Sequence, residues 1–140
     1  MSTIVVLAGE GEYESDRTMR AVADDLHHEL GARVVYRTPD VLEDMPNFPC
    51  STFGGLDDLR NADVLVIYTR FRILPDEEMR RIVDFCGQGG NVLGLRTSTH
   101  AFHYAPESPW FAWNEGFGRE VLGSPWISHH GHTSATDVTL

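Results

Sequence analysis

The chain contains no lysine, since all eleven of the permanently cationic side chains among its 140 residues are arginine. Schiff-base chemistry, attachment of pyridoxal phosphate, the phosphate-binding amine of a P-loop and the ATP-pairing amine of a kinase all require a lysine. Enzymes of these classes are therefore excluded. Neither pyridoxal phosphate nor ATP is an expected cofactor.

Positive charge of any kind is scarce. The chain has 21 acidic side chains against 11 arginines, which gives a formal net charge of −10. A surface that binds nucleic acid needs clustered cations to neutralise phosphates, and binding to an anionic membrane has the same requirement. We therefore expect neither nucleic acid nor membrane as a partner, and a small-molecule ligand instead.

Long apolar runs and paired cysteines are missing too. The longest uninterrupted apolar runs, residues 4–8 and 64–68, have the length of a strand and fall short of a membrane span. Cys50 and Cys86 lack CxxC spacing and are typical of reduced thiols in the cytosol. The N-terminus has no basic region and acidic residues begin at Glu10, so a secretion signal is not expected. We therefore predict a cytoplasmic protein.

What the sequence does contain is an alternation of strand-like and helix-like segments. Four runs rich in β-branched residues predict buried strands, at residues 4–7, 33–36, 64–68 and 91–95. The helical period of apolar residues predicts a helix with Ser15 as its N-cap that ends at Gly31. A second helix begins with Pro75 in its first turn and ends at Gly87. This alternation predicts an α/β, three-layer sandwich with a mostly parallel sheet.

Other stretches lack such periodicity. Residues 38–55 contain three prolines and end in two glycines, which predicts a long irregular connection before a short helical piece at 56–60. Beyond residue 96 the chain is polar and rich in tryptophan and histidine, which indicates side chains that make contacts. Residues 137–140 resemble the start of another strand. We therefore expect a single domain over residues 1–140 that is shortened at its C-terminus.

A ligand site is expected where the loops that follow the strands meet, because open α/β sheets bind ligands beyond the carboxyl ends of their strands. Three predicted loops converge there, at residues 9–15, 69–73 and 96–103. The first loop has a glutamate where a dinucleotide-binding fingerprint needs its third glycine, and its carboxylates would repel a phosphate. Neither flavin nor NAD is therefore an expected cofactor.

The first two loops supply candidate ligand contacts. Glu12 and Tyr13 are candidates for contact with sugar hydroxyls or a metal, and Arg70 is a candidate on the second loop. The alternative for the glutamates of the first loop is a structural role, in which they complement the helix dipole or pair with Arg70 and Arg72.

The turn after the fourth predicted strand occupies the place of a nucleophile elbow, but its sequence is Gly94-Leu95-Arg96-Thr97-Ser98 instead of GxSxG or GxCxG. Arg96 is a permanent, forked cation that polarises an oxygen or clamps a carboxylate, or else forms a buried ion pair with a glutamate. His100 is a candidate catalytic residue, and Thr97, Ser98 and His103 are candidate ligand contacts. Ser98 with His100 is too common a pairing in loops to indicate a catalytic dyad.

The run His129-His130-Gly131-His132 offers imidazoles two residues apart, which an extended segment projects to one side. His129 and His132 are candidate ligands of a divalent metal such as zinc, and His130 is a candidate catalytic residue. The alternative is a polar loop whose histidines bond to backbone groups. Trp126 belongs either to the core or to a platform that stacks on a sugar ring.

Several short motifs occur in a fixed order over most of the chain: Leu7-Ala8-Gly9 leading to Glu12-Tyr13-Glu14, then residues 63–68, 89–95, 117–118 and 122–123, and the histidine run. In this order they resemble the ThuA-like (trehalose-utilisation) proteins of the class I glutamine amidotransferase-like superfamily. The resemblance implies a flavodoxin-like sandwich that lacks the amidotransferase cysteine, and a link to disaccharide or keto-sugar metabolism. The family commonly has a histidine where Arg96 stands, and its domains usually extend further.

The leading hypothesis is a ThuA-like protein that binds a sugar-like small molecule at the carboxyl edge of the sheet, without amidotransferase activity. A sugar-modifying or hydrolase-like activity is expected of Arg96, His100 and His130. The expected ligand contacts are Glu12, Tyr13, Arg70, Thr97, Ser98, His103 and Trp126. Two alternatives stay open: a non-catalytic interaction or assembly domain, which Arg96 at the elbow favours, and a divalent-metal-dependent hydrolase. Assembly into a homo-oligomer is left open as well.

Overall fold

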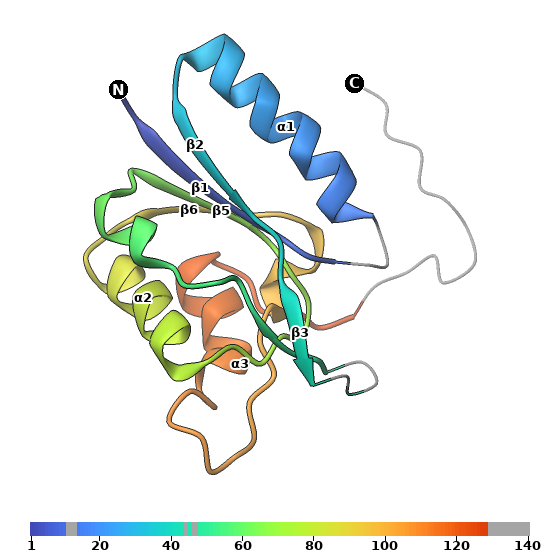
Figure 1. The fold of residues 1–140 in the computed structure, drawn as a ribbon. Helices are drawn as coiled ribbons and strands as arrows, with labels where there is room; N and C mark the ends of the chain where they lie inside the picture. The colour runs from blue at the N-terminus through green and yellow to red at the C-terminus, as the bar shows by residue number, and fades with distance from the viewer. Residues whose placement is uncertain (11–13, 44, 46–47, 129–140) are drawn as a thin grey trace.

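A four-stranded parallel sheet forms the centre of the molecule. The computed structural model describes residues 1–10, 14–43, 45 and 48–128. The strands are β1 (Thr3–Ala8), β2 (Arg33–Arg37), β5 (Val64–Tyr68) and β6 (Asn91–Gly94), all paired in parallel. Their spatial order is β2-β1-β5-β6, which is the order of a flavodoxin-like fold (Figure 1). The predicted α/β fold with a mostly parallel sheet is confirmed.

Helices cover both faces of this sheet. Helix α1 (Ser15–Leu30) lies on one face, and α2 (Asp76–Gly87) lies on the other with α3 (Trp113–Gly116) (Figure 1). Alternate residues of β1 supply the two cores, because successive side chains of a strand point to opposite faces. Val5 and Leu7 belong to the core with α2, whereas Val6 belongs to the core with α1.

The two ends of α1 differ in how well the sequence predicts them. Gly31 ends the helix with a left-handed φ of 61°, as expected. Ser15 was predicted as the N-cap, but that position is taken by Glu14, and Ser15 is the first residue of the helix. Its buried hydroxyl accepts a hydrogen bond from the Glu10 amide at 2.6 Å and donates one to the Glu10 carbonyl at 3.1 Å. Ser15 therefore ties the helix to the end of β1.

The connection over residues 38–55 is more regular than expected. It contains two short antiparallel strands, β3 (Asp40–Glu43) and β4 (Cys50–Thr52), before the predicted helical piece η2 (Asp57–Asn61). All residues of β3 are exposed, so no alternating pattern marks it in the sequence. The buried carboxylate of Glu78 on α2 fixes the chain beyond β4, where it accepts bonds from Thr52 Oγ1, Phe53 N and Gly55 N at 2.5, 3.0 and 2.8 Å.

The segment beyond residue 96 was expected to be irregular, but it contains helical turns. They are η3 (Arg96–His100), the short helix α3 and the π-helical turn η4 (Phe117–Val121). Gly118 permits this packing, because a Cβ at that position would lie 2.4 Å from the Thr99 carbonyl oxygen. Within the described ranges, no helix has the length and apolar character that a membrane span requires.

Candidate functional site

Arg72 lies beyond the end of β5, where the strand order reverses between β1 and β5, and it bonds to the end of β1 and to β4. Its guanidinium group donates one hydrogen bond to the Gly9 carbonyl oxygen after β1 and another to Ser51 Oγ of β4, at 2.9 Å. Burial lowers the pKa of the Arg72 guanidinium, and the nearby Glu10 carboxylate acts in the opposite direction. Glu10 is itself buried. Glu10 is therefore close enough for its charge to favour the cationic form of Arg72.

The loops that follow β5 and η3 run side by side. The Phe71 amide donates to the His100 carbonyl at 2.9 Å, the Arg72 amide to the Ala101 carbonyl at 2.8 Å, and the His103 amide to the Arg72 carbonyl at 3.1 Å. These bonds continue the parallel pairing of the sheet beyond its carboxyl edge. They bring together the side chains of Phe71, His100 and His103.

Five rings meet at this edge, and we call them the aromatic–histidine cluster: Phe48, Phe71, His100, His103 and Trp126. The ring centroids of Phe71 and His100 are 4.8 Å apart, and those of His100 and Trp126 are 4.9 Å apart. Phe48 stacks on His103 with a centroid separation of 3.9 Å. The guanidinium carbon of Arg70 lies 5.1 Å from the centroid of Phe71, within the range of a cation–π contact.

Four rings of the cluster, those of Phe71, His100, His103 and Trp126, line a pocket of about 530 Å³, and Phe48 stacks on His103 behind them. The late segment contributes further lining side chains, among them Phe111 from the turn before α3, Asn114 and Glu115 from α3, and Arg119 from η4. Asn114 is held in place because its side chain accepts from the Tyr104 amide at 2.7 Å and donates to the Tyr104 carbonyl at 2.9 Å. Arg119 and Glu115 form an ion pair of 2.9 Å. The pocket thus combines aromatic faces with charged and hydrogen-bonding groups.

The backbone at Phe71 is strained. Its φ of 48° lies in the left-handed region, which a bulky residue rarely adopts. Such conformations persist where the surrounding structure requires them, and they are common at ligand sites. Here the strained residue is the one that contacts His100, His103 and Trp126.

Three predicted site residues line this pocket: His100, His103 and Trp126. Arg96 is exposed, has a φ of 49° and is not among the lining residues. Glu12, Tyr13, His129, His130 and His132 lie outside the residues that the structure describes.

Thr97 and Ser98 are buried, and their hydroxyls bond within the protein. Thr97 Oγ1 donates to the Thr69 carbonyl at 2.8 Å, and Ser98 Oγ donates to the Ile67 carbonyl at 2.7 Å. In this position they hold η3 against the end of β5. The structure therefore gives these two predicted ligand contacts a positioning role.

Phe48, Phe71, Phe111, Asn114 and Arg119 were not predicted as site residues. Phe71 had a signal in the sequence, since it lies between the two arginines of the predicted loop 69–73. Phe48 and Phe111 had none, because both follow prolines in stretches without periodicity. Their place in the site depends on how these stretches fold back over the sheet edge.

The chemistry of the pocket is that of aromatic stacking and of imidazoles that donate and accept hydrogen bonds. Within the ranges that the structure describes, no three histidine, cysteine or acidic side chains are grouped as metal ligands would be. No family model matches the chain, and neither a curated protein nor a solved structure matches it. The nature of the ligand has to be inferred from the pocket itself.

Proposed function

We propose that the chain is a ThuA-like protein that binds a sugar or sugar derivative in the aromatic–histidine pocket. The observation that supports it most is the contact of Phe71, His100 and Trp126 in the wall of a 530 Å³ pocket. The apolar face of a sugar ring stacks on aromatic side chains, while its hydroxyls need hydrogen-bonding groups nearby. This pocket offers both.

The proposed contacts divide by chemistry. Trp126 and Phe71 stack on the ring, and Glu115 and Arg119 bond to hydroxyls at the rim. His100 is the group suited to accept a proton from a sugar hydroxyl, because an imidazole nitrogen in the pocket wall can act as a general base. Thr99 Oγ1 lies 3.4 Å from His100 Nδ1 and restricts the orientation of the ring.

Calorimetry with a panel of disaccharides and 3-keto sugars tests this function. Trp126→Ala is expected to weaken binding at least about tenfold, because it removes a ring on which the sugar stacks. The exposed Trp126 side chain is not part of the core, so the fold should persist. Trp110→Ala is the matched control, because Trp110 bonds to Asp76 on α2 and does not line the pocket. Failure of every sugar to bind, or equal losses in both variants, would refute the proposal.

A non-catalytic interaction domain is the second candidate, and the edge strand β6 favours it. β6 is the last strand of the described sheet, carries no charged residue, and exposes 52% of Leu93. An uncharged edge strand is a template for pairing with another chain. If the chain forms a homo-oligomer through β6, light scattering should show that Leu93→Asp shifts it toward monomer. Leu30→Asp on α1 is the control and should not do so. A monomeric parent chain would exclude self-association.

A further inference from the structure

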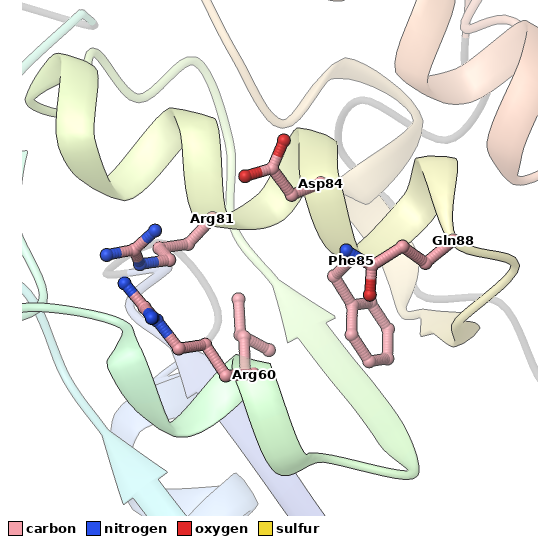
Figure 2. A pocket seen from close by; sticks show the side chains of 6 residues that line it. Arg60, Arg81, Asp84, Phe85 and Gln88 are labelled. Atoms are coloured by element: carbon pink, nitrogen blue, oxygen red, sulfur yellow. The ribbon is translucent and has the colours of Figure 1, made fainter.

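A second cavity, which we call the arginine cleft, lies between η2 and α2. It has a volume of about 210 Å³ and is lined by Leu59, Arg60, Arg81, Asp84, Phe85 and Gln88 (Figure 2). η2 directly precedes β5, and the last turns of α2 directly precede β6. The cleft therefore lies toward the amino ends of these strands, away from the aromatic–histidine pocket.

Two guanidinium groups lie side by side at one end of this cleft, those of Arg60 and Arg81 (Figure 2). Their Nε atoms share one oxygen of Asp57, Oδ1, at 3.2 and 2.9 Å. Glu77 adds a longer contact, 3.7 Å from Arg81, through a side chain that is 79% exposed. Two guanidinium groups that share one carboxylate oxygen are close enough to repel each other. The exposed carboxylates of Asp57 and Glu77 offset that repulsion only in part. This end of the cleft is therefore suited to receive a further anionic group.

Beside the two arginines, the cleft has a fixed apolar wall and two polar lining residues, Asp84 and Gln88. Leu59 and Phe85 are buried members of the core beneath α2. The side chain of Arg81 is only 17% exposed, so its guanidinium group is largely held in position. Asp84 also lines the cleft, but the ion pairs of the two guanidinium groups are with Asp57 and Glu77 and not with Asp84. A ligand here meets positive charge at one end and a rigid apolar surface beside it.

We propose that the arginine cleft binds a small monocarboxylate, whose carboxylate bonds to Arg60 and Arg81 and whose apolar body lies on Phe85. The forked guanidinium group matches the geometry of a carboxylate. A dianionic phosphate fits less well, because Asp57 already pairs with both guanidinium groups and Asp84 adds a second carboxylate to the lining of the cleft. The cleft is smaller than the pockets of about 300–1,000 Å³ that hold drug-sized ligands, so the ligand has few heavy atoms.

Benzoate is a suitable probe, followed by ¹H–¹⁵N correlation spectra of the full chain at constant ionic strength. We expect saturable shifts at the amides of Arg60, Arg81, Phe85 and Gln88. Benzyl alcohol, which has a similar shape without the charge, should leave these amides unchanged. Arg60→Gln should weaken benzoate binding at least about tenfold, because a charge-assisted bond is lost from an exposed side chain. Arg17→Gln is the matched control, since Arg17 also forms an exposed i,i+3 pair.

The other outcomes contradict the proposal. Shifts that do not saturate, equal shifts with benzyl alcohol, or unchanged binding in Arg60→Gln would show that the arginines have a structural role only, in which the pair of Arg81 with Asp57 holds η2 to α2. Saturation by inorganic phosphate at a lower concentration than benzoate would assign the cleft to phosphate instead. These measurements do not involve the aromatic–histidine pocket, so they can fail while sugar binding holds, and the reverse.

Discussion

The aromatic–histidine pocket and the arginine cleft lie toward opposite ends of the same parallel strands, and the chain builds them differently. The pocket consists of loops whose backbones bond to one another beyond the sheet, as between Phe71 and His100. The cleft consists of side chains from η2 and α2, above the core that these elements share. The pocket therefore depends on contacts between distant loops, whereas the cleft depends on the packing beneath it.

The largest expected effect comes from Glu78, on the helix that carries the cleft. Glu78→Ala leaves the hydroxyl of Thr52 and the amides of Phe53 and Gly55 without their acceptor. The free energy of unfolding, measured in urea, should fall by about 3–5 kcal/mol, because each buried unsatisfied donor is destabilising. Glu77→Ala is the control, since that side chain is 79% exposed. A loss no greater than in the control would show that packing alone holds residues 52–55 to α2.

Arg72 is the corresponding support of the pocket. Arg72→Met keeps the apolar stem but removes the charged bonds to Gly9 and Ser51. We expect a loss of about 2–3 kcal/mol of unfolding free energy, together with weaker sugar binding and unchanged benzoate binding. Arg33→Met is the control, because Arg33 is half exposed and reaches Asp58 only at 3.6 Å. Equal effects on both ligands would remove the distinction between the two regions.

Two substitutions at Phe71 distinguish the effect of its backbone strain on stability from the effect of its ring on binding. Phe71→Gly and Phe71→Ala both remove the ring, so both should abolish stacking in the pocket. Glycine adopts the φ of 48° without the steric penalty of a Cβ. The free energy of unfolding should therefore be about 1 kcal/mol higher for the glycine variant than for the alanine variant. If the two variants are equally stable in urea, the backbone at this position is not strained.

The smallest expected change in stability appears at alkaline pH, beneath the cleft. Burial raises the pKa of Cys86 on α2 from 9.0 to about 11. The neutral thiol thus favours the folded chain up to about pH 9, and this contribution is lost as the pH rises through about 11. At pH 10 the effect should stay below about 1 kcal/mol, since a partly exposed thiol is screened by solvent. The free energy of unfolding in urea should fall less between pH 8 and pH 10 in Cys86→Ala than in the parent chain. An unchanged fall would assign it to other groups, such as Tyr104, whose pKa is also raised by burial.

The elements that the sequence predicts best are those in which local pattern and burial agree. The strand at Val64–Tyr68 is an apolar run that lies in the middle of the described sheet, and Gly31 ends α1 at the predicted place. The short strands β3 and β4 were missed, because their pairing and the Glu78 bonds beyond them are tertiary contacts. The turns after residue 96 were missed for a similar reason, since Gly118 is needed only where η4 meets Thr99.

Part of the candidate site could also be predicted. His100 and His103 line the pocket because loops that follow parallel strands converge at one edge, whereas Trp126 reaches it from the segment after η4. That rule does not give the direction of individual side chains, so it could not separate His100 from the buried Ser98. The arginine cleft was not predicted at all. Arg60 and Arg81 are far apart in the sequence, and Asp57 joins them only after η2 packs on α2.

The bonds of Arg72 also bear on the order in which the chain folds. Its partner Gly9 is 63 residues away in the sequence, and its partner Ser51 is 21 residues away. Contacts of such long range form slowly, because large loops of chain must close before the contact forms, whereas α1 and α2 need only local bonds. The carboxyl edge that carries the pocket is thus expected to be among the last parts of the molecule to take shape, after the helices have formed and docked.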